Sequence, residues 1–184
     1  MNHLRGIAYA FLALICLTST DVFAQTQTSG KVYTVESVTK TGAGKAADLT
    51  WKDGTKQVNL LQFGAGKVVF LNFWATWCPP CIRSIPEAKS IWNTYKNKNF
   101  VLLGISLDKD LDTWKDYVKE QQMSWMQVAD GNFWDNKAAM LYGIGSIPSV
   151  WILDQNGNIA LKDVNPLSEG EAIRAKITEL LNKK

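Results

Sequence analysis

The chain of 184 residues, 46% of them hydrophobic, is long enough for one ordinary domain with a core of its own. Its formal net charge of +3 is small, and no basic stripe runs along it. We therefore exclude nucleic acids and anionic membrane surfaces as expected partners.

Residues 1–24 have the features of a secretory signal peptide. Arg5 supplies a basic start, residues 6–17 are apolar, and Val22-Phe23-Ala24 is a candidate cleavage site. This apolar run is about 12 residues long, whereas a membrane-spanning helix needs about 20. We expect an exported, periplasmic or otherwise extracytoplasmic protein whose mature domain, residues 25–184, is not stably inserted in a membrane. An uncleaved N-terminal anchor is the alternative.

The first part of the mature chain is predicted to form strands. Lys31 to Val38 alternates apolar and polar residues, which is typical of an edge strand. Leu49 to Trp51 and Gln57 to Leu60 flank Lys52-Asp53-Gly54-Thr55 and predict a hairpin with an Asp-Gly turn. Val68 to Trp74 is β-branched and aromatic, which predicts a strand buried on both faces.

The motif Trp77-Cys78-Pro79-Pro80-Cys81 follows this buried strand, and apolar residues then recur at helical spacing as far as Tyr95. With Cys78 as the N-cap, Pro79 takes the first helical position, where a missing N–H costs nothing. The first free N–H of the helix then belongs to Cys81, and a Cys78 thiolate can accept from it. This bond and the helix dipole should lower the pKa of Cys78 below the free value of about 8.5.

Two cysteines three residues apart in a helical turn lie within reach of a disulfide. Cys78 and Cys81 are therefore predicted to be a redox couple, in which the first attacks and the second resolves the mixed disulfide. A zinc site would need four ligands, and the predicted mature chain offers only these two cysteines and no histidine. A purely structural disulfide would close too short a loop to add much stability. We expect no metal and no other cofactor.

The chain after the motif alternates between predicted strands and helices. Phe100 to Leu107 reads as a second buried strand, and Asp108 and Asp110 are expected to begin the next helix. Trp125 to Val128 is a short strand, and Asp135 is expected to cap a short helix that ends at Tyr142.

The last part of the chain is predicted to be a hairpin followed by a helix. Ser149 to Leu153 and Asn158 to Lys162 are its two strands, and Ser168 to Glu171 reads as a capping box. The final helix carries apolar residues on one face. The whole order predicts an α/β fold, a central mixed sheet with helices on both faces.

The run from Asn72 to Cys81 resembles the active-site sequence of thioredoxin-fold proteins, in particular the exported thiol-disulfide oxidoreductases of the TlpA/ResA type. Asp53-Gly54, Pro86 and Ile147-Pro148 match the same pattern. The resemblance covers roughly residues 49–181 and implies a thioredoxin-like fold with an N-terminal strand and hairpin extension.

The resemblance also implies residue roles. Cys78 is the nucleophile, Cys81 is the resolving thiol, and Pro148 is a cis-proline that leaves the backbone of Ile147 free to pair with a substrate segment. Trp77 and Pro79, on either side of Cys78, are expected to contact the substrate; a plain core tryptophan is the competing interpretation of Trp77.

Two positions depart from the family pattern. Asn72 stands where thioredoxin has a buried aspartate, and Ser84 stands where many ResA-type members have a glutamate. Neither familiar base for Cys81 is present, and the sequence does not choose among Glu87, Asp108 and Asp130. Deprotonation of Cys81 by water alone, or by a group outside the motif, is the remaining alternative.

The sequence thus predicts an exported protein-disulfide reductase that exchanges disulfides with protein substrates. The resemblance implies a membrane thiol donor of the DsbD kind as the reductant, and makes cytochrome c biogenesis one possible setting. The alternatives are a DsbA-like oxidase or isomerase, and a non-enzymatic copper-binding or docking module on the same fold. The lack of histidine in the predicted mature chain argues against copper.

Overall fold

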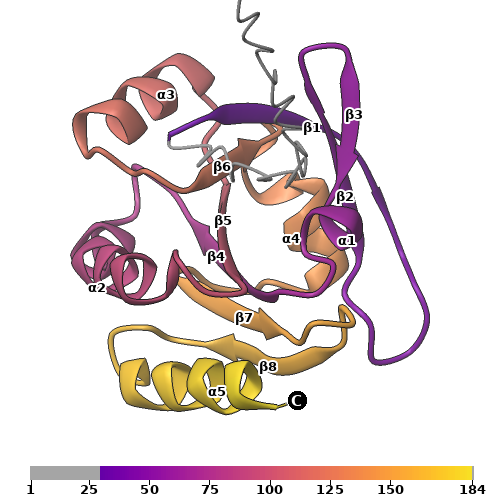
Figure 1. Cartoon of the computed structure of the whole chain (residues 1–184). Coiled ribbons are helices and arrows are strands. Elements are labelled where there is room, and N and C mark those ends of the chain that lie inside the picture. The colour runs from indigo at the N-terminus through magenta and orange to yellow at the C-terminus, as the bar shows by residue number, and fades with distance from the viewer. Residues whose placement is uncertain (1–29, 184) are drawn as a thin grey trace, which may run out of the picture.

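The computed structural model describes residues 30–183, so the predicted signal peptide lies outside the described residues. Eight strands form one sheet in the order β3-β2-β1-β6-β5-β4-β7-β8 (Figure 1). The strands are β1 Val32–Thr39, β2 Asp48–Asp53, β3 Lys56–Asn59, β4 Val68–Trp74, β5 Phe100–Ser106, β6 Met126–Ala129, β7 Ser149–Leu153 and β8 Ile159–Val164. The helices are α1 Leu60–Phe63, α2 Pro79–Tyr95, α3 Leu111–Glu120, α4 Lys137–Tyr142 and α5 Gly170–Asn182, with a short 3-10 helix, η1 Phe133–Asp135.

Strand β4 leads directly to the candidate site. It pairs in parallel with β5 and antiparallel with β7, and every one of its residues is buried. Because neighbours pair with both of its edges and helices cover both of its faces, apolar side chains are favoured along its whole length. The predicted bounds and the two-sided burial of this strand are confirmed.

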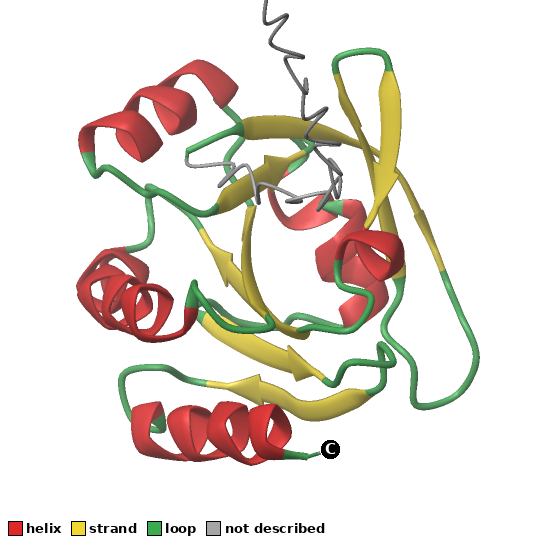
Figure 2. Cartoon of the chain, in the orientation of Figure 1, coloured by secondary structure: helices red, strands yellow, loops and turns green. Residues whose placement is uncertain are grey.

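Helices cover both faces of the sheet, as predicted. Figure 2 shows α2 and α3 on one side and α4 on the other. Helix α5 lies beside α2, since the Tyr95 hydroxyl is 3.0 Å from the Thr178 hydroxyl and Arg174 pairs with Glu87 at 2.8 Å. Among the helices of residues 30–183, none has the length and apolar character required to cross a bilayer.

Most predicted elements are confirmed to within a few residues. Strands β2 and β3 form the antiparallel hairpin around Gly54, whose φ of 63° explains why a glycine follows Asp53 at this turn. Helix α2 continues through Pro86 to Tyr95. The final hairpin and the buried face of α5, with Ile173, Ile177 and Leu180, are also as predicted. The short helix α1 was not predicted.

The prediction that the first strand is an edge strand was wrong. Strand β1 lies inside the sheet, antiparallel to β2 and, through Val32 to Thr34, parallel to β6. An alternating pattern reports that one face of a strand meets solvent, but it carries no information on how many neighbours pair with the backbone.

Of the predicted helix starts, that of α3 was right for Asp110 but wrong for Asp108, and those of α4 and α5 were wrong. Helix α3 begins after Asp110, which accepts from the N–H groups of the first turn, whereas Asp108 is buried before the helix. Helix α4 is capped by Asn136 rather than Asp135, because only the Asn136 side chain points at the helix and accepts from Ala139 N at 2.9 Å.

The predicted capping box before α5 does not form. The box would use the side chains of Ser168 and Glu171, but the helix starts one residue later, at Gly170, so that Glu169 is the N-cap residue. The Glu169 carboxylate accepts from the backbone N–H of Asn165 at 3.0 Å and does not cap the helix.

Candidate active site

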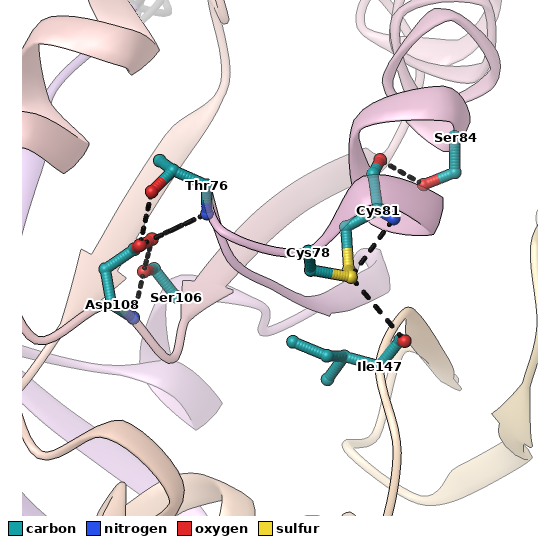
Figure 3. Close-up of a disulfide and its surroundings, with 7 residues drawn as sticks. All are labelled: Thr76, Cys78, Cys81, Ser84, Ser106, Asp108 and Ile147. Atoms are coloured by element: carbon teal, nitrogen blue, oxygen red, sulfur yellow. Dashed lines mark hydrogen bonds between the residues drawn. A yellow bond between two sulfur atoms is a disulfide. The ribbon is translucent and has the colours of Figure 1, made fainter.

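Cys78 and Cys81 form a disulfide at the start of α2, with their Cα atoms 5.2 Å apart. Cys78 is the N-cap residue, with extended backbone angles, and Pro79 and Pro80 occupy the first two helical positions. The N–H of Cys81 points at Cys78 Sγ at 3.2 Å (Figure 3). The predicted N-cap geometry is therefore confirmed, and it would stabilise a thiolate at Cys78 after reduction.

The two cysteines differ in their surroundings. Cys78 keeps 4% of its surface exposed and Cys81 only 1%, so Cys78 is the more accessible of a largely buried pair. Cys78 Sγ lies 3.6 Å from the carbonyl oxygen of Ile147, in the loop that precedes β7 (Figure 3). A disulfide sulfur has no proton, so this contact can become a hydrogen bond only when Cys78 is a thiol.

The Ile147–Pro148 peptide bond is cis, as the family resemblance implied. Pro148 is buried and Ile147 is half-buried, whereas Pro79 on the other side of the sulfur is exposed. The fold therefore brings Cys78 and Ile147 into contact, although they are 69 residues apart in the sequence.

The segment before Cys78 is anchored to the end of β5. The buried Asp108 carboxylate accepts from Thr76 N at 3.0 Å, from Thr76 Oγ1 at 2.6 Å and from Ser106 Oγ at 2.6 Å (Figure 3). Sequence reasoning did not find this network, because only the pairing of β4 with β5 places Asp108 beneath Thr76.

The candidate bases for Cys81 are each engaged elsewhere. Glu87 is paired with Arg174, Asp130 accepts from Asn136 Nδ2 and Lys137 N, and Asp108 holds Thr76. The two positions that depart from the family are buried: Asn72 in β4, and Ser84, whose Oγ donates to the carbonyl oxygen of Cys81 at 2.7 Å.

Trp77 is exposed over 42% of its surface, which rules out the competing interpretation of a plain core tryptophan. Its ring centroid lies 4.9 Å from that of Phe133 and 6.1 Å from that of Trp134, both in η1. These two aromatic residues beside the disulfide were missed because neither belongs to a periodic pattern or a motif.

A disulfide at the start of a helix, next to a cis-proline loop, can exchange with another thiol or disulfide. Residues 66–159 match a family model described as thioredoxin-like. The chain belongs to the thioredoxin-like family.

Relatives of this thioredoxin-like chain include two proteins named "Thiol-disulfide oxidoreductase ResA". The one from Bacillus cereus is 28% identical, with 64% of each chain aligned, and the one from Bacillus thuringiensis is 27% identical, with 70% of this chain and 69% of the relative aligned. The chain thus spans less than two thirds of the first relative's length.

Solved structures agree with the family and the fold. A thiol-disulfide oxidoreductase from Bacteroides fragilis is 36% identical with a TM-score of 0.60, over 68% of this chain and 90% of that one. The thioredoxin domain of a thiol-disulfide oxidoreductase from Bacteroides vulgatus is 25% identical with a TM-score of 0.64, over 78% of this chain and all of that one.

Proposed function

We propose that this protein is an exported thiol-disulfide oxidoreductase that reduces disulfides in protein substrates. The observation that carries the proposal is the Cys78–Cys81 disulfide at the start of α2, with Cys78 Sγ facing the N–H of Cys81 and the Ile147 carbonyl. The relatives and the solved structures named above support the same chemistry.

In the proposed reaction, the Cys78 thiolate attacks one sulfur of a substrate disulfide. A mixed disulfide forms, and the other substrate sulfur leaves as a thiolate. The Cys81 thiolate then attacks Cys78 Sγ, which releases the second substrate thiolate and leaves the Cys78–Cys81 disulfide. Cys78 is the attacking sulfur because it is the more exposed and the one at the helix N-terminus.

The substrate segment is proposed to lie across the loop opposite the disulfide. The backbone of Ile147 would pair with it as an added strand, with Pro148 beneath and Trp77 and Pro79 at the edges of the contact. Each cycle leaves the protein oxidised, so an external dithiol must restore it. A DsbD-like membrane thiol donor is the proposed source, and the signal-peptide features of residues 1–24 support the proposal that the protein works outside the cytoplasm.

Insulin reduction tests the activity. The reduced wild-type protein should precipitate insulin chains, and Cys78→Ser should not; equal activity in the two proteins would end the proposal. Cys81→Ser should instead accumulate the mixed disulfide, and capturing it in the native cell would identify the substrate. The mass of the protein recovered from those cells tests the signal-peptide proposal: cleavage after Ala24 leaves residues 25–184, whereas an intact N-terminus favours the membrane-anchored alternative.

The direction of the reaction is tested by titration against glutathione. Reductases and oxidases of this kind span roughly −270 to −120 mV. A midpoint above about −150 mV would contradict the reductase assignment and favour a DsbA-like oxidase.

A further inference from the structure

Three exposed aromatic side chains gather beside the disulfide. Trp77, Phe133 and Trp134 are exposed over 42%, 41% and 37% of their surfaces. Their ring centroids lie 4.9 to 6.2 Å apart, so each ring contacts the other two. We refer to these three residues as the aromatic platform. Rings of this size are usually buried, and an exposed group of them marks an interaction surface.

The backbone holds Phe133 in this exposed place. Its φ is 54°, in the left-handed region that a bulky aromatic residue rarely adopts. The conformation is maintained from both sides: the Asn136 N–H donates to the Phe133 carbonyl at 3.2 Å, and Asp130 Oδ1 accepts from Asn132 N at 3.1 Å. The backbone of Phe133 is thus held in an unfavourable conformation while its side chain stays 41% exposed, which points to a functional reason for its position.

An open pocket of about 450 Å³ adjoins the platform on the side of α3. Its lining residues are Thr76, Trp77, Asp108, Lys109, Asp110, Thr113 and Phe133. The apolar part comes from the rings of Trp77 and Phe133. The charged part contains two carboxylates and one lysine, so the pocket repels an acidic side chain more than a neutral or basic one.

The position of the pocket determines what can reach it. Trp77 is bonded to Cys78, so any chain whose cysteine meets Cys78 must place its neighbouring residues close to Trp77. The docking surface is thus continuous with the reacting sulfur. The occupant that fits is the segment that carries the reactive cysteine of a protein substrate.

We propose that the aromatic platform and the pocket beside it bind a large apolar side chain close to the reactive cysteine of the substrate, and disfavour an acidic side chain there. This inference rests on the proposed function. It adds a preference for substrate sequence, and it assigns Phe133 and Trp134 to substrate binding.

Short peptides that carry a thionitrobenzoate mixed disulfide on a single cysteine provide the test. One backbone is varied with Leu, Phe, Ala, Lys or Asp at each position flanking the cysteine. Attack by the reduced protein releases thionitrobenzoate, whose absorbance gives the rate. Each rate is divided by the rate with the small reagent dithiobis-nitrobenzoate, so that changes in thiol reactivity cancel. The proteins are wild type, the double variant Phe133→Ser/Trp134→Ser, and Leu167→Ser, which removes an exposed apolar residue far from the disulfide in the sequence.

With wild type, at least one flanking position should show rates about tenfold higher for Leu or Phe than for Ala, and the lowest rate for Asp. The double variant should reduce this advantage to below about twofold, and Leu167→Ser should keep it. Equal wild-type rates across the peptide series, or an advantage that survives in the double variant, would overturn the inference. Failure of the proposed function would look different, since Cys78→Ser would then reduce insulin as well as wild type does.

Discussion

Asp108→Ala removes the carboxylate that connects the end of β5 to the segment before Cys78. The side chain is 3% exposed and accepts from three donors: Thr76 N, Thr76 Oγ1 and Ser106 Oγ. Alanine leaves all three without this acceptor. The two hydroxyls can rotate toward other acceptors, but the Thr76 N–H cannot, because the backbone fixes its direction.

The expected loss follows from these contacts. A hydrogen bond to a charged group contributes about 1.5–3 kcal/mol, and a buried donor left unsatisfied costs about 1–3 kcal/mol. Part of this loss is offset, because the variant no longer buries a carboxylate. We therefore expect Asp108→Ala to lower the free energy of unfolding by about 2–4 kcal/mol. Asp108→Asn keeps one oxygen for Thr76 N and offers an NH₂ group to the hydroxyl oxygens, so it should cost about 1 kcal/mol.

Urea unfolding of the disulfide form, followed by far-UV circular dichroism, measures these differences. Asp116→Ala, which removes an exposed carboxylate from α3, is the matched control and should leave the midpoint unchanged. A loss below about 1 kcal/mol for Asp108→Ala, or an equal loss for the alanine and asparagine variants, would refute the reasoning. The first result would mean that the hydrogen bonds of Asp108 contribute little to stability. The second would mean that the loss does not come from removing the oxygen that accepts from Thr76 N.

Other substitutions test the packing around the site. Gly104→Ala would place a Cβ 2.0 Å from Gln127 Oε1, so we expect a loss of about 1–3 kcal/mol in urea unfolding, partly recovered when Gln127→Ala is added; no loss would contradict the close approach. Asn136→Ala should cost about 2–3 kcal/mol, because the buried amide caps α4 and bonds two other segments; Asn136→Asp, which keeps the cap acceptor for Ala139 N, should cost less. Burial raises the pKa of Tyr142 above its ordinary value of 10.0, so the unfolded chain loses this proton first. The contribution of protonated Tyr142 to the free energy of unfolding should be fully present below pH 10 and should be lost as the pH rises above it. The free energy of unfolding should therefore fall less steeply with pH in Tyr142→Phe than in wild type, and equal slopes in the two proteins would refute this.

The sequence by itself determined the local features of the site, because these depend on residues close together in the chain. Six apolar or aromatic residues among the seven from Val68 to Trp74, with Asn72 the exception, define β4, and the two prolines after Cys78 define where α2 begins. The Cys78–Cys81 pairing and the bond from Cys81 N follow from the geometry of one helical turn, which is the same in any fold. The family resemblance added the cis bond at Pro148, which base rates alone would not have predicted.

Only the tertiary structure decided which distant residues meet at the site. The order of strands in the sheet places β1 between two neighbours and brings Asp108 under Thr76, across a separation of 32 residues. It also brings Phe133 and Trp134 against Trp77, and these rings follow no pattern in the sequence. Periodicity and capping patterns report the local preferences of the chain, whereas these contacts depend on how strands and helices far apart in the sequence pack together.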